Sequence, residues 1–232
     1  MIYKNGFRII CLGTYCLPRV IATVCHFKLK KEQGEKTCPF DLAFCWNFDG
    51  ILDVLDKEFM NFFTNLEYDY FYNENVRNDL SAYFTAKLEA KFWKNEHFGF
   101  IFNHETGFSF DDFKSRYEKR INNFYEYIKD NDTELYFLIS SFNPISDEQI
   151  VKLNNIISHY RSIESFKNII INQSENNLII NQENTHIINA GIYNQIFRGD
   201  WALMIKEHEK YKEVNKLYNL IDENLKKYIL KT

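Results

Sequence analysis

Apolar and polar positions along the chain form short blocks that predict strands and helices in turn. Phe7 to Leu12 is an apolar run of strand length, and the stretch from Leu17 to Phe27 has apolar residues at helical spacing. Gly13 separates the two blocks, which favours a tight turn. Pro18 fits the start of the helix, because the first helical turn has no partner for the N–H that proline lacks. The beginning of the chain therefore predicts a strand, a turn and a helix.

The middle of the chain continues this alternation. The segment from Glu67 to Tyr83 is rich in Tyr, Asn and Asp without a clear period, and we expect it to be irregular. Phe98 to Phe102 predicts a strand. A charged helix is expected from about Phe110 to Lys129, and its first turn carries carboxylates that suit the helix dipole. Glu134 to Ser141 then predicts a buried strand.

The last third predicts a helix, several short strands and a closing helix. Ser146 and Gln149 are spaced as in a capping box, which indicates a helix start. Closely spaced strands, which we interpret as antiparallel, and a C-terminal helix follow at about 168–171, 177–180, 186–189 and 201–228.

This order of elements predicts the fold class. Strands alternating with helices, followed by closely spaced strands, are typical of an α/β to α+β protein with a central mixed sheet and helices packed on it. The chain has 232 residues, eight glycines and three prolines, and no Ser/Gly/Pro-rich linker divides it. We therefore expect residues 1–232 to form a single domain.

Composition and charge narrow the classes of partner. Apolar residues make up 45% of the chain and aromatic residues 17%, which is enough for a sizeable core. The net charge is −4, so we expect no nucleic acid partner. The basic run from Lys28 to Lys31 is interpreted as a solvated loop. The first residues do not resemble a signal peptide and no apolar run is long enough for a membrane span, so we expect a cytoplasmic protein.

Five cysteines lie within the first 45 residues: Cys11, Cys16, Cys25, Cys38 and Cys45. An odd number in a reducing compartment argues against a disulfide framework. Cys25, His26, Cys38 and Cys45 include the side chains of a zinc site, but no Cys-x-x-Cys or His-x₃₋₅-His spacing is present. We expect neither a metal nor another cofactor.

Cys16 is the leading candidate for chemistry. At the start of a helix it would face unpaired backbone N–H groups and the positive end of the helix dipole, and both favour a thiolate. A cysteine nucleophile needs a base, and His104 follows an apolar strand from which it could project into a cleft. His186 is the second choice. For a third member, Asp41 and Asn143 are the main options beside Ser141.

The order of these residues resembles a known family. Gly13-x-x-Cys16, Pro39-Phe40-Asp41, His104 after an apolar strand, and a basic helix containing Lys119 and Arg120 follow one another between about residues 7 and 145. This order is similar to that of a bacterial family of unassigned function whose members are described as papain-like cysteine peptidases. The chain departs from the family pattern at Leu42, where Trp is usual, and at Lys119, where a second Arg is common. Residues 146–232 carry no motif that matches.

The resemblance implies a papain-like cysteine hydrolase with Cys16 as nucleophile, His104 as base and Asp41 at the matching acidic position. The papain arrangement would instead nominate Asn143 as the orienting residue. Acyl-enzyme chemistry does not distinguish a peptidase or amidase from an acyltransferase. We expect a small acyl or amide compound, a peptide or a glycan precursor as substrate; the sequence leaves the oligomeric state open.

Two other interpretations remain. In an esterase-type α/β hydrolase, Glu183-x-x-His186 would supply the base in place of His104. In a non-catalytic binding module, the aromatic run from Tyr68 to Tyr72 would stack on sugar rings or bind a partner chain. Proximity of Cys16 to His104 or to His186 distinguishes the first two interpretations, and unusual thiol reactivity distinguishes both from the third.

Overall fold

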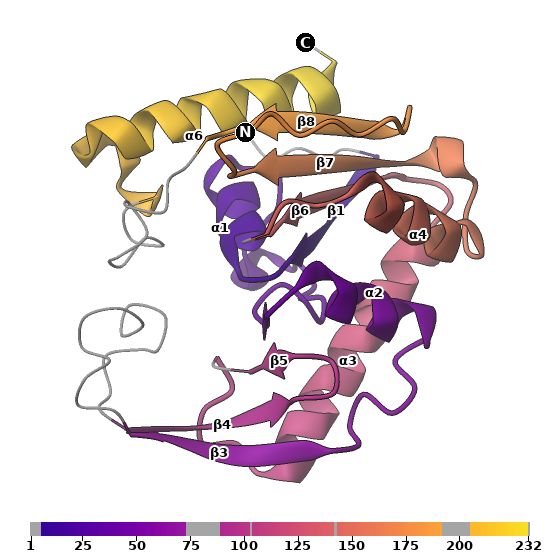
Figure 1. Ribbon diagram of the computed structural model, residues 1–232, viewed down its shortest axis with the longest axis vertical. Coiled ribbons are helices and arrows are strands. Elements are labelled where there is room, and N and C mark those ends of the chain that lie inside the picture. The colour runs from indigo at the N-terminus through magenta and orange to yellow at the C-terminus, as the bar shows by residue number, and fades with distance from the viewer. Residues whose placement is uncertain (1–5, 73–88, 103, 142, 192–204, 232) are drawn as a thin grey trace.

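The computed structural model describes residues 6–72, 89–102, 104–141, 143–191 and 205–231. These residues form a parallel sheet and an antiparallel sheet with helices packed around them (Figure 1). The parallel sheet has the strand order β1-β6-β7-β8 and the antiparallel sheet has the order β2-β5-β4-β3. The predicted mixed α/β class is therefore confirmed, with two sheets in place of one mixed sheet.

The elements have the following bounds. The strands are β1 (Phe7–Gly13), β2 (Phe44–Cys45), β3 (Leu66–Tyr72), β4 (Glu89–Asn95), β5 (Phe100–Ile101), β6 (Glu134–Ser140), β7 (Phe166–Asn172) and β8 (Thr185–Asn189). The α-helices are α1 (Leu17–Val24), α2 (Phe48–Asp56), α3 (Phe110–Lys129), α4 (Asp147–Ser158) and α6 (Lys212–Leu225), and α6 continues into a π-helical turn, Lys226–Leu230. Short 3₁₀ turns lie at Lys31–Gln33, Ile163–Ser165 and His208–Lys210.

The parallel sheet separates two apolar layers. Along β1, Ile10 and Leu12 belong to one apolar cluster while Ile9 and Cys11 belong to the other, because successive side chains of a strand point to opposite faces. One face packs against α1 and α6, and the other against α2, α3 and α4 (Figure 1). A sheet covered on both sides explains why its strands are continuous apolar runs.

The strands of the parallel sheet end at one common edge. Gly13 is aligned with Ser140, Ser140 with Ile171, and Asn172 with Asn189. Side chains and loops that follow these residues therefore gather there. Crevices outside the carboxyl ends of parallel strands are common places for ligands and catalytic groups. This edge is called the carboxyl edge below.

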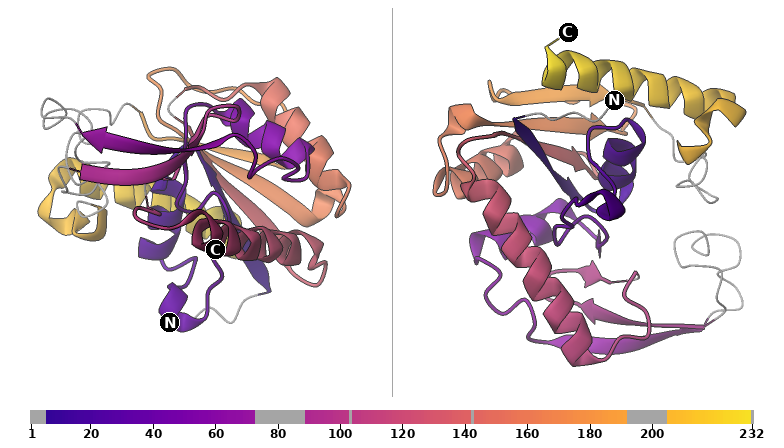
Figure 2. Two further views of the ribbon diagram at one scale, coloured as in Figure 1. Left: turned by 90° about the horizontal axis from the view of Figure 1, so that it is seen from below. Right: turned by 180° about the vertical axis from the view of Figure 1, so that it is seen from behind.

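Helix α3 links the two sheets. It runs from the antiparallel sheet to the parallel one (Figure 2, right). On the side of the antiparallel sheet its aromatic residues pack on Phe102, the residue after β5: the rings of Tyr117 and Phe102 have centroids 4.8 Å apart. A second link is a hydrogen bond of 2.8 Å from the N–H of Cys45, in β2, to the carbonyl of Thr14. The loop after β1 is thus tied to the antiparallel sheet.

Several predicted elements are confirmed and others are wrong. The predicted strand, turn and helix at the beginning of the chain are confirmed. Ser146 and Gln149 form both hydrogen bonds of the capping box of α4. The expected antiparallel end of the sheet is wrong, because β7 pairs in parallel with both β6 and β8. The connections that contain α4 and residues 173–184 return the chain to the starting edge each time, which is the requirement for parallel pairing.

Other differences concern single segments. Residues 177–180 form no strand, and Leu66–Tyr72 is a strand where an irregular segment was expected. Residues 73–83 of that segment and residues 201–204 of the expected last helix lie outside the described residues. No helix in the described ranges combines the length and apolar character that crossing a membrane requires.

Candidate active site

Cys16 stands at the junction that the sequence predicted. It is the N-cap residue of α1, its carbonyl accepts the first helical hydrogen bond from Val20 at 3.1 Å, and Pro18 lies in the first turn. The turn before it requires glycine, because a Cβ on Gly13 would lie 2.5 Å from the carbonyl oxygen of Tyr15. The tight turn therefore places Cys16 at the carboxyl edge of the parallel sheet.

Cys16 is also the most accessible thiol. Of the five cysteines, all of which the structure describes, the other four are buried and Cys16 is partly exposed. Burial nevertheless raises the pKa of Cys16 to about 11, although its own backbone N–H and the ammonium of Lys206 act in the opposite direction. The expectation of a thiolate is therefore wrong for the free protein, because desolvation outweighs the helix terminus.

A neutral hydrogen-bond network lies beside Cys16. The hydroxyl of Tyr15 donates to Oε1 of Gln173 at 2.6 Å, and the hydroxyl of Ser140 donates to Tyr15 at 3.2 Å. The N–H of Thr14 donates to the carbonyl of Ser140 at 3.0 Å. These buried groups join the ends of β1, β6 and β7, so they fix the loop that carries Cys16.

Asn143 follows β6 at the same edge. Its side chain is exposed, and its backbone N–H donates to the hydroxyl of Ser141 at 3.3 Å. Among the described residues no hydrogen bond joins it to His104. Its proposed role as orienting residue stays a prediction.

Asp41 lies in a buried ionic cluster. One carboxylate oxygen accepts from the N–H of Cys38 at 2.9 Å and lies 3.8 Å from Nζ of Lys28. Lys28 also donates to the carbonyl of Ile9 at 2.6 Å and lies 3.6 Å from Glu35. Burial alone would lower the pKa of Lys28, but Asp41 and the other acidic groups around it raise the pKa above its usual value. The carboxylate of Asp41 thus closes the Cys38–Asp41 turn against β1.

The position of Lys28 corrects the interpretation of the basic run. Its side chain is 1% exposed, whereas the sequence pattern predicted a solvated loop for Lys28 to Lys31. The reason is that the chain turns back after α1: the N–H groups of Phe27 and Lys28 both donate to the carbonyl of Ala22 at 2.9 Å. This turn places the side chain of Lys28 against β1, where its ammonium donates to the carbonyl of Ile9 and lies close to the carboxylate of Asp41.

His104 occupies a different environment, two residues after Phe102. Its side chain is exposed, yet desolvation by the surrounding protein lowers the pKa of its imidazole. The charge of Arg120 lowers this pKa further, whereas the charge of Glu105 raises it. Glu105 is buried and forms ion pairs with Arg120 and, at 2.8 Å, with Nε of Arg116. Arg120 in turn interacts electrostatically with Asp41.

Of the three predicted catalytic residues, Asp41 and His104 are linked only through their electrostatic interactions with Arg120. Arg120 acts on both Asp41 and His104, while Cys16 is influenced by Lys206. Within the described ranges, no hydrogen bond or ion pair joins any two of Cys16, Asp41 and His104. Glu105 and the Tyr15–Gln173 pair were not anticipated. Glu105 stands next to His104 in the sequence, but the two arginines that hold it come from α3, and only the fold brings them there.

His186 lies far across the sheet from Cys16. It is the second residue of β8, level with Ile169 of β7, and its ring stacks on Tyr228 with centroids 4.1 Å apart. Two strands, β6 and β7, separate β8 from β1. The geometry gives no support to the esterase-type arrangement of Cys16 with His186.

The aromatic run of the binding-module interpretation lies on β3. The exposed ring of Tyr68 packs against Trp93 of β4 with centroids 4.8 Å apart and an interplanar angle of 45°, so at least this ring covers a neighbour within its own sheet. No group of three or more His, Cys, Asp or Glu with the geometry of a metal site occurs among the described residues.

Comparison with known proteins gives one match. No curated protein and no solved structure matches the chain. A family model described as "Putative papain-like cysteine peptidase (DUF1796)" matches residues 7–176. The match begins at the residue where the resemblance begins and extends past residue 145, through β7. It covers well over half of the 232 residues, so the chain belongs to this family, whose members are described as papain-like cysteine peptidases.

Proposed function

We propose that the protein is a cysteine hydrolase or acyltransferase that forms an acyl-enzyme on the sulfur of Cys16. The observation that carries this proposal is the position of Cys16, partly exposed at the N-terminus of α1 and at the carboxyl edge of the parallel sheet. Membership of a papain-like cysteine peptidase family supports the same residue type as nucleophile. A helix N-terminus also offers N–H groups to the oxyanion that forms during acyl transfer.

The chemistry proceeds in two steps. The sulfur of Cys16 attacks a carbonyl carbon while its proton moves to a base, and the leaving amine or alcohol departs with a proton as the thioester forms. Water, an amine or a hydroxyl then attacks the thioester, and the sulfur regains its proton. Because the resting pKa of Cys16 is about 11, the thiol starts neutral and the proton must leave during the attack. A base is therefore essential.

His104 is the base in this proposal. Its lowered pKa keeps the imidazole neutral at pH 7, which is the state that accepts a proton. Within the described residues no hydrogen bond joins it to Cys16. Asp41 is the proposed third member, because Arg120 interacts electrostatically with both Asp41 and His104; Asn143 is the alternative.

A small acyl or amide compound, a peptide or a glycan precursor is the proposed substrate class. The family's description as peptidases supports an amide bond. The thioester stage accepts water or an acceptor molecule equally well in chemical terms, so hydrolysis and acyl transfer share the same first step.

Acylation by an activated ester tests the nucleophile directly. Incubation with p-nitrophenyl acetate at pH 7.5 should add one acetyl group to Cys16, detected by peptide mass spectrometry. Cys16→Ala should abolish this acylation and leave the melting temperature nearly unchanged, because the thiol is partly exposed. Cys25→Ala is the matched control, since that cysteine is buried and should not be acylated.

Two histidine variants test the base. His104→Gln should slow acylation about 100-fold, the lower end of what a general base contributes. His186→Gln should leave the rate unchanged, because its ring lies across the sheet against Tyr228. Acylation that persists in Cys16→Ala would refute the nucleophile, and an unchanged rate in His104→Gln would refute the base.

A further inference from the structure

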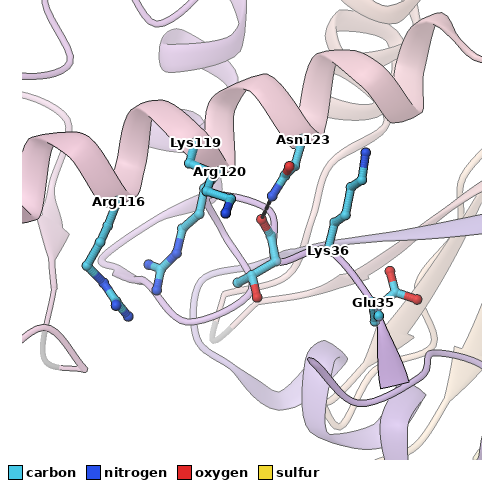
Figure 3. A pocket seen from close by; sticks show the side chains of 8 residues that line it. Glu35, Lys36, Arg116, Lys119, Arg120 and Asn123 are labelled. Atoms are coloured by element: carbon cyan, nitrogen blue, oxygen red, sulfur yellow. Dashed lines mark hydrogen bonds between the residues drawn. The ribbon is translucent and has the colours of Figure 1, made fainter. Parts of the chain in front are cut away.

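Four of the eight residues that line a cavity outside the Cys16 region are cationic. The cavity has a volume of about 380 Å³ and lies between the segment from Gly34 to Thr37 and one face of α3. Cys16 does not line it. Figure 3 shows the side chains that do, among them Lys36, Arg116, Lys119, Arg120 and Asn123, with Glu35 as the acidic member.

The arginines of this cavity carry more positive charge than their partner neutralises. Arg116 and Arg120 lie one turn apart on α3 and extend from the same side of the helix (Figure 3). Both form ion pairs with the single carboxylate of Glu105. One negative charge between two guanidinium groups leaves a surplus, and this surplus faces a cavity that is partly shielded from water.

Arg120 also has an unused donor. Its side chain is 7% exposed, and its Nη1 atom has no hydrogen-bond partner among the described residues. A buried guanidinium N–H without an acceptor is energetically unfavourable, so an acceptor oxygen supplied by a ligand would stabilise it. Arg120 is already fixed, because Nη2 binds Glu105 and its guanidinium lies 4.6 Å from the ring centre of Tyr117.

Some of the other side chains that line the cavity already have hydrogen-bond or ion-pair partners, and others do not. Lys36 is paired with Glu126. Glu35 accepts from the hydroxyl of Tyr127 at 2.6 Å and lies 3.6 Å from Nζ of Lys28, which it shares with Asp41. Lys119 forms no hydrogen bond or ion pair within the described part of the chain. Lys119 and Nη1 of Arg120 are therefore available to a ligand.

We propose that this cavity binds a phosphate group, either as the free ion or as part of a small phosphorylated molecule. Several cationic donors around one point suit a tetrahedral dianion better than a single carboxylate, and arginine matches phosphate oxygens geometrically. The hydrogen bond of 2.9 Å from Asn123 to the carbonyl of Thr37 holds the loop against α3 and keeps the cavity formed. A volume of about 380 Å³ also leaves room for a sugar-sized group beside the phosphate.

Calorimetric titration of the full chain at low ionic strength tests the proposal, with inorganic phosphate, glucose 6-phosphate and succinate as probes. We expect phosphate to bind in a 1:1 ratio and succinate at least about tenfold more weakly. Lys119→Ala should weaken phosphate binding about tenfold, the effect of losing one hydrogen bond to a charged group. Lys114→Ala is the matched control, because Lys114 lies on the same helix outside the cavity and its side chain is partly exposed.

The outcomes distinguish free phosphate from a phosphorylated molecule as the ligand, and some of them would overturn the proposal. Tighter binding of glucose 6-phosphate than of phosphate identifies a phosphorylated molecule, and equal binding identifies the ion. No phosphate binding at millimolar concentrations, equal binding of succinate, or equal weakening by Lys114→Ala would overturn the proposal. If Lys119→Ala has no effect, Arg116→Gln is the second variant, and no effect in both would also overturn it.

Cys16 lies outside this site, although Arg120 also interacts electrostatically with His104 and Asp41. Cys16→Ala should therefore bind phosphate as the unmodified chain does. A protein that binds phosphate but is not acylated would contradict the proposed function alone.

Discussion

The residues predicted for catalysis lie in two regions, one built from buried ion pairs and the other from neutral hydrogen-bonding groups. The first region, called the charged network here, contains buried ions that compensate one another: Lys28 with Asp41, and Arg120 with Glu105 beside His104. The second region, at the carboxyl edge, holds Cys16 among the neutral groups of Tyr15, Ser140 and Gln173.

The difference indicates what each region can do. Buried ions are costly unless their partners stay in place, so the charged network fixes loops and tolerates little change. Neutral hydrogen bonds fix the loop at Cys16 without adding a charge, so the sulfur can change its protonation when a substrate arrives. Lys206 is the exception, because its ammonium favours the thiolate of Cys16.

The largest effect is expected from Glu105→Ala in the charged network. Glu105 is 1% exposed and serves both Arg116 and Arg120, so its loss leaves a buried guanidinium without a carboxylate. The free energy of unfolding should fall by about 3–5 kcal/mol, measured by urea denaturation. Glu118→Ala, on the exposed face of α3, is the control and should cost no more than about 0.5 kcal/mol. A loss below about 1 kcal/mol for Glu105→Ala would mean that the ions do not hold the structure.

A smaller effect is expected from Tyr15→Phe at the carboxyl edge. The change removes the hydroxyl that donates to Gln173 and accepts from Ser140, and leaves Oε1 of Gln173 without this donor. A neutral buried hydrogen bond of this kind should contribute about 1–2 kcal/mol in the same denaturation experiment. Tyr211→Phe changes an exposed tyrosine and is the control. A cost as large as that of Glu105→Ala would remove the distinction between the two regions.

The same contrast explains how far sequence reasoning reached. Signals that act between near neighbours predicted structure correctly: Gly13 and Pro18 around Cys16, and Ser146 with Gln149 at the start of α4. Such features depend on the backbone within a few residues, which the sequence displays directly.

Features that depend on distant segments were not predictable. Lys28 has the sequence context of a solvated lysine, and it is buried because Asp41 and the carbonyl of Ile9 meet it there. The pairing of β3 with β4 joins strands separated by residues 73–88, without a short turn signal between them. The prediction of a thiolate at Cys16 was wrong for the same reason. Desolvation raises the pKa of the thiol, and its extent depends on the distant segments that pack around the sulfur.

The smallest effect concerns the protonation of His104, which lies at the margin of the charged network. Its pKa in the folded protein is lowered from the usual 6.5, so below pH 6.5 the unfolded chain binds this proton more readily than the folded one. The contribution of His104 should therefore make stability rise with pH up to about 6.5 and become flat above it. The melting temperature should fall less between pH 7.5 and 5.5 in His104→Gln than in the unmodified chain.

His186→Gln provides the matched comparison, because the pKa of His186 is also lowered by burial, with Lys167 and Lys227 adding to it. Each single variant should remove part of the pH dependence, and the two parts should add because the histidines share no contact. A steeper fall for His104→Gln would mean that the carboxylate of Glu105 outweighs burial and Arg120, and that the folded protein holds His104 as a cation. A cationic imidazole accepts no proton, so this result would also remove His104 as the base for Cys16.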